Sequence, residues 1–215
     1  MIFKDRHEAG TRLAASLKRF SRESTVVFAI PPGGIVPASI VATSLHAPLN
    51  LVVLRRIPHP RNSQTLLAVV SEHGNILSSG APIDSLEAGW LGLEVRKQEQ
   101  EARRLRHLYG EDTAPVRGRT AILIDDGMIT GLTMSLAIEE VRRLEPERVV
   151  VAVPAATAAA IEKVRPLADA TATIVEMPDG AETLAFSYAQ FKPVTDQLVT
   201  KTMRASHVAA ERSTP

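Results

Sequence analysis

Short runs of continuous apolar residues recur along the chain, separated by stretches with helical spacing. The runs are Val26 to Ile30, Leu51 to Leu54, Ala121 to Ile124, Val149 to Val153 and Thr171 to Val175. Continuous apolar character is typical of strands that are buried on both faces of a parallel sheet. Between two of the runs, apolar residues from Met134 to Leu144 follow the spacing of an amphipathic helix. The pattern predicts an α/β fold in which a parallel sheet has helices on both faces.

Two parts of the chain break this alternation. The runs Leu66 to Val70 and Asn75 to Leu77, joined through a His-Gly turn, predict a hairpin. The segment Ile83 to Tyr109 predicts one long helix with a thin apolar seam. That seam consists of Leu86, Trp90, Leu93, Leu105 and Leu108. The rest of the helix carries charges of both signs, which favours a solvated surface over a binding surface.

Composition limits the class of protein. A chain of 215 residues with 45% hydrophobic content can bury one sizeable core, so we expect one domain over residues 1–204 and a flexible polar tail over 205–215. The 25 lysines and arginines nearly cancel the 24 acids, so the overall charge gives no support to a nucleic-acid partner. A local basic patch of Arg103, Arg104, Arg106 and His107 is the exception.

Cysteine content and hydropathy bear on location. The chain has no cysteine, which excludes disulfides, thiolate zinc sites and cysteine nucleophiles, and which fits a reducing cytoplasm. The start is charged, and no apolar run approaches the roughly 18 residues of a membrane span. We therefore expect a cytoplasmic protein with no membrane partner.

The segment with the clearest chemistry follows the third apolar run. Two adjacent acids, Asp125 and Asp126, come at the carboxyl end of a predicted strand, where open α/β sheets bind ligands. A turn rich in glycine and threonine, from Gly127 to Thr133, then opens a helix and offers N–H groups and hydroxyls to a phosphate. Acids beside a phosphate-binding turn suit a sugar phosphate. The alternative is a turn whose acids only cap the helix.

The segment Ile122 to Thr133, ILIDDGMITGLT, resembles the phosphoribosyl-pyrophosphate motif of type I phosphoribosyltransferases. The likeness extends to the stand-alone predicted phosphoribosyltransferases of bacteria and archaea. It is carried by FKDRHEAGTRLA, AIPPGGIVPA, APLNLVVLRRIPHP, VVVAVPAA and FSYAQFKPVTDQLV, in that order. The resemblance implies the type I phosphoribosyltransferase fold, with the hairpin and long helix of residues 60–110 inserted as a hood or lid.

The resemblance also assigns roles to residues. It implies that Asp125 and Asp126 hold the ribose and that Arg55 and Arg56 hold the pyrophosphate. The 5′-phosphate would lie on Gly127, Met128, Ile129, Thr130, Gly131, Leu132 and Thr133, and the pyrophosphate also on Pro32, Gly33 and Gly34. From the residues alone, Pro31 to Gly34 is equally well read as a simple turn. Surface charge is the alternative for the two arginines, but cations at the carboxyl end of a buried strand are better placed than most to bind an anion. Magnesium is the implied cofactor, held by the two aspartates through water.

Several departures from the family pattern cluster near this chemistry. Pro32 stands where the family usually has an arginine, and Pro58 where it has a glycine. A proline has no N–H and no cationic side chain, so the pyrophosphate half of the site loses more donors than the ribose half. Ile129, Arg56 and the Ala189-Gln190 pair also differ from the family residues. Sequence drift around an intact fold is the alternative explanation.

The expected activity is transfer of a 5-phosphoribosyl group from phosphoribosyl pyrophosphate to an unidentified nitrogenous-base acceptor, with release of pyrophosphate. The alternative is a non-catalytic sensor or regulator that binds phosphoribosyl pyrophosphate or a nucleotide on the same fold. We also expect a homodimer, since the long helix carries an apolar seam that one small core leaves uncovered, and homodimers are the commonest oligomers.

Overall fold

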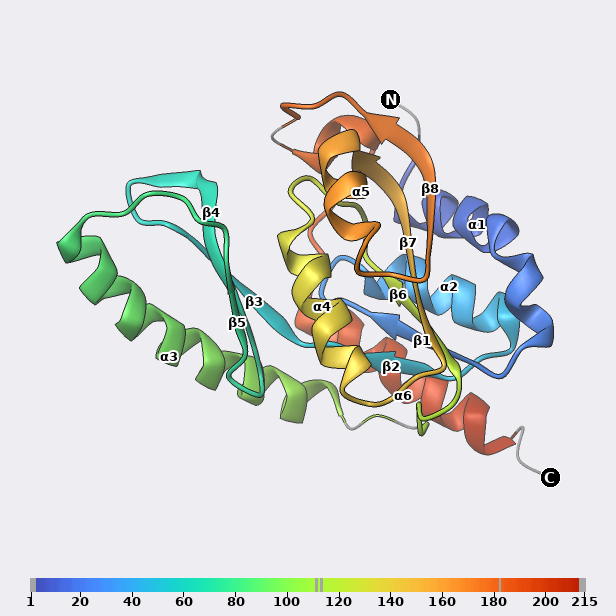
Figure 1. Ribbon diagram of the computed structural model, residues 1–215. Helices are drawn as coiled ribbons and strands as arrows, with labels where there is room; N and C mark the ends of the chain where they lie inside the picture. Colours follow the sequence, from blue (N-terminus) through green and yellow to red (C-terminus); the bar gives the residue numbers. More distant parts are fainter. Residues whose placement is uncertain (1–2, 111, 113, 182, 213–215) are drawn as a thin grey trace.

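The computed structural model describes residues 3–110, 112, 114–181 and 183–212 of the 215-residue chain. Within them, the side chains of residues 64, 85, 86, 207 and 209–212 are not described. Figure 1 shows a main body, built around one sheet, and an arm formed by a second sheet and a long helix.

The main sheet has five parallel strands in the order β2-β1-β6-β7-β8. They are β1 (Thr25–Ala29), β2 (Leu49–Leu51), β6 (Thr120–Ile124), β7 (Arg148–Thr157) and β8 (Ala170–Met177). The three central strands are buried along almost their whole length, as the continuous apolar runs predict. The expected parallel sheet of an α/β fold is therefore confirmed.

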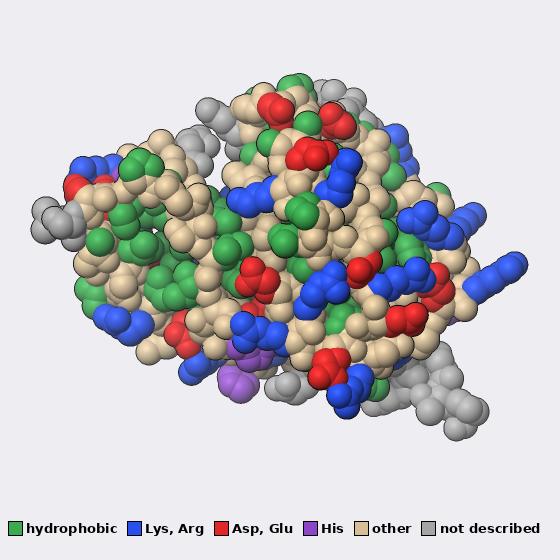
Figure 2. Space-filling model, viewed as in Figure 1, with side chains coloured by type: hydrophobic (Ala, Val, Ile, Leu, Met, Phe, Trp, Pro, Cys, Tyr) green, Lys and Arg blue, Asp and Glu red, His purple; other side chains and the backbone are tan. Residues whose placement is uncertain are grey.

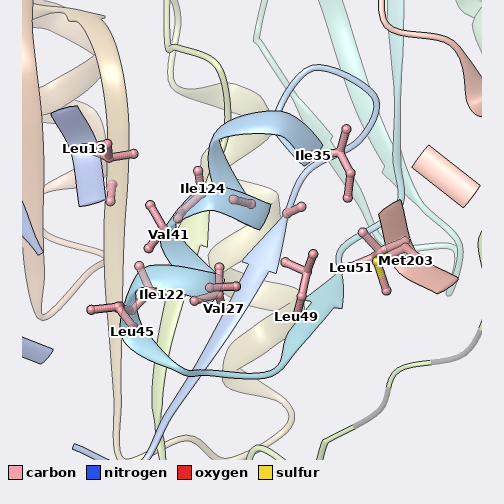
Figure 3. Packing of buried hydrophobic residues seen from close by; sticks show 14 of the residues in the cluster. Leu13, Val27, Ile35, Val41, Leu45, Leu49, Leu51, Ile122, Ile124 and Met203 are labelled. Atoms are coloured by element: carbon pink, nitrogen blue, oxygen red, sulfur yellow. The ribbon is translucent and has the colours of Figure 1, made fainter. Parts of the chain in front are cut away.

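Helices cover both faces of this sheet. Helices α1 (Arg6–Ser16), α2 (Ile35–Leu45) and α6 (Asp196–Arg212) pack on one face, and α4 (Leu132–Arg142) and α5 (Ala158–Val164) pack on the other. Alternate residues of each strand divide between the two cores, so Val27 joins the first and Phe28 the second. Figure 3 shows the first core, where Leu13, Val41 and Leu45 meet Val27 and Ile122. Two short 3-10 helices, η1 (Lys18–Arg22) and η2 (Leu184–Ser187), complete the body.

The arm consists of an antiparallel sheet, β3 (Leu54–His59), β4 (Asn62–Ser71) and β5 (Ile76–Ser78), with α3 (Ser85–Tyr109) packed against it. The predicted hairpin is confirmed as β4 and β5.

The prediction that Leu51 to Leu54 forms one strand is wrong, because this run crosses the end of β2 and the start of β3. Arg55 and Arg56 consequently lie inside β3, whereas the sequence placed them after the second strand of the main sheet.

The long helix is confirmed, but its apolar seam differs from the predicted one. Trp90 packs against the arm sheet and Leu105 against the first core of the body, as expected. Leu93 and Leu108 are instead 63% and 42% exposed, and the side chain of Leu86 lies outside the described residues. The seam shifts because the first half of α3 covers the arm sheet while its second half covers the body, so no single stripe is buried throughout.

Arg106 of α3 bonds both to the hairpin turn of the arm and to β2 of the body. Its guanidinium donates to both carboxylate oxygens of Glu72, to Asp112 at 3.0 Å and to the main-chain oxygen of Leu51 at 2.8 Å. A second tether runs from the turn between β4 and β5 to α4. There His73 Nδ1 and Asn75 Nδ2 lie 2.7 and 2.6 Å from the carboxylate oxygens of Glu140, which is buried. The arm is thus fixed to the helix that follows the glycine-threonine turn.

The basic patch predicted on α3 is neutralised by acids. Arg103 pairs with Glu99, Arg104 with Glu101, and Arg106 with Glu72 and Asp112. On the face shown in Figure 2, lysine and arginine side chains are likewise interspersed with aspartate and glutamate. The charge distribution therefore gives no support to nucleic-acid binding on this face or along this helix.

The last helix is longer than the sequence suggests. Helix α6 continues through residues 205–212, which were expected to form a flexible tail, and 213–215 lie outside the described residues. Flexibility of this end stays a prediction. Among the described helices, none is both long enough and apolar enough to cross a membrane.

Replacing Arg106 with alanine should destabilise the whole protein. The side chain is only 13% exposed and its loss leaves Glu72, which is 10% exposed, without its cation. Removing one partner of such a pair costs about 3–5 kcal/mol, and we expect a loss near the lower limit because Asp112 is partly solvated. Urea denaturation measures the free energy of unfolding. The control is Arg104→Ala, whose exposed side chain should leave the midpoint nearly unchanged. Equal effects of the two substitutions would refute the role of Arg106 as a tether.

Candidate functional site

A cavity of about 440 Å³ opens at the carboxyl ends of β1 and β6. Most of the residues singled out in the sequence line it. These are Pro32, Gly33, Arg55, Arg56, Asp125, Asp126, Gly127, Met128, Ile129, Thr130, Gly131 and Thr133. Gly34 and Leu132 do not line the cavity, and the Leu132 side chain is buried in the second core. The structure therefore brings together three segments that lie far apart in the chain.

The two acids stand at the end of β6, where the strand leaves the sheet. The main-chain N–H of Asp126 donates to Asp125 Oδ1 at 2.8 Å, which fixes the two residues beside each other. Burial, together with the negative charge of Asp126, raises the pKa of Asp125 well above its usual range, while Arg56 acts in the opposite direction. Asp125 is therefore short of positive charge, and a cation or a hydrogen-bond donor from a ligand would stabilise its ionised form.

The turn from Gly127 to Thr133 is held by β7. Met128 donates to Ala155 O at 2.9 Å and accepts from Thr157 N at 3.1 Å, and Thr157 Oγ1 donates to Ile129 O at 2.7 Å. Gly131 has a φ of 71° and precedes the first turn of α4, a left-handed conformation that favours glycine. The N–H groups of that first turn lie at the cavity end of an 11-residue helix. This arrangement provides a rigid set of donors for an anion.

The loop from Pro31 to Gly34 lies against the acid pair. A Cβ added to Gly33 would lie 2.3 Å from Asp126 Oδ2, and one added to Gly34 would lie 2.6 Å from Ile124 O. Both contacts are impossible for a side chain, so the glycines are needed for close approach and not merely for turning. The peptide bond between Pro31 and Pro32 is cis. The close approach favours a loop shaped around Asp126 over a generic turn.

The arm brings two cations to the cavity. Arg55 and Arg56 are neighbours in β3 and therefore point to opposite faces of the arm sheet. Arg55 Nε donates to Gln98 Oε1 of α3 at 2.9 Å, whereas Arg56 is exposed and its charge acts on Asp125. The two arginines, which the sequence treats as an equivalent pair, differ in position and in partners.

Arg6 is a site residue that the sequence analysis missed. Its Nε donates to Asp126 Oδ2 at 2.7 Å and its Nη1 to Lys192 O at 2.6 Å. The guanidinium carbon lies 3.9 Å from the centre of the Phe191 ring, within the range of a cation–π contact. Arg6 and Phe191 both line the cavity. The available signal was the family-like segment FKDRHEAGTRLA, which matched as a whole but carried no role for its arginine.

The first described residues and the segment after β8 form one wall of the cavity. Main-chain bonds join Phe3 to Ser187 and Ala189, and the Tyr188 hydroxyl donates to Asp126 O at 2.6 Å. Burial and the charge of Asp126 raise the pKa of Tyr188, so this hydroxyl stays protonated as a donor. Leu184 packs closely against Gly127, since a Cβ added to this glycine would lie 2.4 Å from Leu184 Cδ2. The wall therefore fixes the position of Asp126 and Gly127.

A metal ion would have few protein ligands here. Among the described residues, no three histidine, cysteine, aspartate or glutamate side chains are grouped as a metal site. Asp125 and Asp126 supply carboxylate oxygens, which suit magnesium, an ion that commonly keeps several waters and shares its coordination with substrate phosphates. The pair fits a magnesium ion that arrives with a phosphate ligand better than one held by the protein alone.

Comparison with known proteins agrees with this architecture. The family model described as a phosphoribosyl transferase domain matches residues 3–184. Two proteins of Mycobacterium tuberculosis, from strains CDC 1551 and H37Rv, are provisionally named phosphoribosyl transferases and are each 35% identical over 157 residues. These residues are 71% of this chain but only 35% of each relative, so the chain spans about a third of their length.

Two solved structures extend the comparison. TT1426 from Thermus thermophilus is 33% identical, with a TM-score of 0.72 over 94% of this chain and 98% of its own. AQ2163 from Aquifex aeolicus, at 11% identity and a TM-score of 0.52 over 80% of this chain and 73% of its own, shares the fold alone. The family model covers all the strands of the main sheet, and it also covers the glycine loop, the acid pair and the turn from Gly127 to Thr133. The chain therefore belongs to the phosphoribosyl transferase domain family.

Proposed function

We propose that the chain transfers a 5-phosphoribosyl group from phosphoribosyl pyrophosphate to a nitrogenous-base acceptor and releases pyrophosphate. The observation that carries the proposal is that one cavity joins the acid pair, the glycine-threonine turn and the glycine loop, with arginines at its edge. A ribose with a phosphate on C5 and a diphosphate on C1 needs these three kinds of partner in one place.

Each part of the site has a separate task. The N–H groups and hydroxyls from Gly127 to Thr133 bind the 5′-phosphate, and Asp125 and Asp126 accept hydrogen bonds from the ribose hydroxyls. Gly33 and Arg56 face the pyrophosphate. Magnesium, brought by the substrate, would neutralise charge on the pyrophosphate and orient it. The protein thus contributes position and electrostatic stabilisation more than covalent chemistry.

The group transfer is a substitution at C1 of the ribose. The lone pair of the acceptor nitrogen forms the new bond to C1, and the bond from C1 to the pyrophosphate oxygen breaks with its electron pair on that oxygen. A proton carried by the acceptor nitrogen leaves for solvent. Positive charge that develops on the ribose ring is stabilised by the two aspartates. The arm, whose Leu54, Arg55 and Arg56 line the cavity, acts as the hood that limits access of water.

One observation favours the second candidate function, a non-catalytic sensor of phosphoribosyl pyrophosphate or nucleotides. Pro31 and Pro32 have no N–H groups, and the Gly34 N–H donates to Ile30 O at 3.0 Å. The loop that would bind pyrophosphate is therefore poor in donors, while the turn for the 5′-phosphate is complete. A sensor for a nucleoside monophosphate needs only the part of the site that binds the 5′-phosphate and the ribose.

A screen of acceptors separates the two functions. Purine, pyrimidine and pyridine-carboxylate acceptors are each incubated with magnesium and phosphoribosyl pyrophosphate, and release of pyrophosphate is followed. We expect release that depends on one class of acceptor and that is lost in Asp126→Asn. Binding of nucleoside monophosphates without pyrophosphate release from any acceptor would favour the sensor.

Replacing Asp125 with asparagine should weaken binding of the magnesium complex of phosphoribosyl pyrophosphate yet stabilise the fold at neutral pH. The folded-state pKa of Asp125 is raised, so its favourable contribution is complete below the unfolded value of about 3.9 and is lost as the pH rises through the folded pKa. Asparagine removes that loss. Calorimetry gives the affinity, and urea denaturation at neutral and acidic pH gives the stability. A variant that is less stable than the parent protein at neutral pH would contradict the assignment.

We also propose that the protein is a homodimer joined through the outer face of α3. Leu93 and Leu108 of α3 are 63% and 42% exposed, and Leu198 of α6 is 40% exposed. Sedimentation at micromolar concentration should show a dimer, and Leu93→Glu should shift it towards monomer. Leu167→Glu, at an exposed position after α5, is the matched control and should leave the dimer intact. A monomer for the unmodified protein would refute the proposal.

A further inference from the structure

The glycine loop lacks the charge that a diphosphate requires. Of its four residues, two are prolines, and Gly34 already donates to Ile30 O. Within the described part of the chain, only the Gly33 N–H of this loop has no main-chain acceptor. None of the four side chains is cationic. A diphosphate placed on this loop must therefore find its positive charge elsewhere in the cavity.

Three arginines line the cavity, and they are not equally placed to provide that charge. Arg55 is bound to Gln98 of α3, and Arg56 is exposed on the arm. Of the three, only Arg6 is hydrogen-bonded to Asp126 Oδ2, the atom nearest to a Cβ built on Gly33. Its Nε lies 2.7 Å from Asp126 Oδ2, and a Cβ built on Gly33 would lie 2.3 Å from the same oxygen. The guanidinium of Arg6 and the backbone of the loop therefore meet at one carboxylate oxygen.

Arg6 is held in place before any ligand arrives. It is the first residue of α1, its side chain is 11% exposed, and it is fixed by Asp126, by Lys192 O and by the Phe191 ring. Ordering a long side chain normally opposes binding, and here that ordering is already complete. Two of the guanidinium nitrogens carry these hydrogen bonds. Within the described residues, the third, Nη2, has no hydrogen-bond partner.

We propose that Arg6 supplies the cation for the pyrophosphate, with Nη2 donating to a pyrophosphate oxygen while Nε keeps its bond to Asp126. When the C1–oxygen bond breaks, the electron pair stays on pyrophosphate, and Arg6 stabilises the added negative charge. Arg6 is then a catalytic residue contributed by the N-terminal helix and replaces a cation that the glycine loop does not have. This inference rests on the proposed function, since it concerns the leaving group of that reaction.

The competing explanation is that Arg6 only positions Asp126. In that case its loss would disturb the ribose-binding acid, and every ligand that includes the ribose would bind more weakly by a similar factor. Pyrophosphate alone, which has no ribose, would then be unaffected. The two explanations therefore predict different patterns across ligands and not merely different magnitudes.

The experiment measures calorimetric affinities for phosphoribosyl pyrophosphate, ribose 5-phosphate and pyrophosphate, each with magnesium. Arg6→Gln should weaken the first and third about ten- to a hundredfold, the worth of a charged hydrogen bond, and ribose 5-phosphate by no more than about threefold. Arg6→Lys keeps the charge and should lose less affinity for these two ligands.

Adding Pro32→Arg to Arg6→Gln places a cation on the loop and should recover much of the pyrophosphate affinity. Arg12→Gln, on the same helix and 43% exposed, is the control and should change none of the three.

Equal weakening of ribose 5-phosphate and phosphoribosyl pyrophosphate in Arg6→Gln, or no change in pyrophosphate affinity, would overturn the inference. If the unmodified protein binds phosphoribosyl pyrophosphate and Arg6→Gln binds it equally well, the proposed function stands and only the role of Arg6 fails. If the unmodified protein does not bind phosphoribosyl pyrophosphate, both fail. Should Arg6→Gln fold poorly, Arg6→Lys and the affinity of the unmodified protein for pyrophosphate decide the matter.

Discussion

The carboxylate of Asp126 is the point on which the site depends. It lies at the end of a buried strand, where it lines the cavity on one side and is closely packed by the glycine loop on another. The glycine loop leaves no room for a side chain, Arg6 bonds to one carboxylate oxygen, and the Tyr188 hydroxyl bonds to the main-chain oxygen. Burying a carboxylate is unfavourable unless it is paired, and Arg6 supplies that pairing. Gly33 leaves room for the carboxylate, and Tyr188 holds the main chain that carries it.

The arm has a different basis of stability. Its sheet contributes Leu54, Leu66 and Val69 to the second core, and its helix contributes Leu105 to the first, so apolar packing joins it to the body. Polar contacts add to this packing: Arg106 donates to the main-chain oxygen of Leu51 in the body, and Glu140 of α4 contacts His73 and Asn75 in the turn of the hairpin. Because Glu140 belongs to α4, the same helix follows the turn from Gly127 to Thr133 at one end and holds the arm near the other. The position of the arm is thus tied to the position of that turn.

The sequence predicts the central architecture because its signals are local. Five apolar runs and the long helix are visible without knowledge of tertiary contacts, and so are the two acids and the turn after them. The errors arise where neighbours far along the chain decide the outcome. The strand β3 contains a proline and alternates in polarity, so its pairing with β4 is not visible in the run that ends at Leu54. Leu93 and Leu108 have helical spacing but face solvent, because α3 packs on two different surfaces. Arg6 could not be assigned, since a pairing across 120 positions leaves no periodic signal.

The contacts between residues 3–6 and residues 187–192 join segments that are synthesised at very different times. Arg6 reaches the main-chain oxygen of Lys192 across 186 positions, one of the longest separations among the hydrogen bonds of the described residues. A ribosome delivers the first helix, the glycine loop and the acid pair long before residues 187–192 emerge. Until then the arginine lacks its aromatic support and the tyrosine that orients the acid is missing. A nascent chain that has not yet reached Lys192 therefore lacks the contacts that hold Arg6, even though every strand of the main sheet precedes that residue.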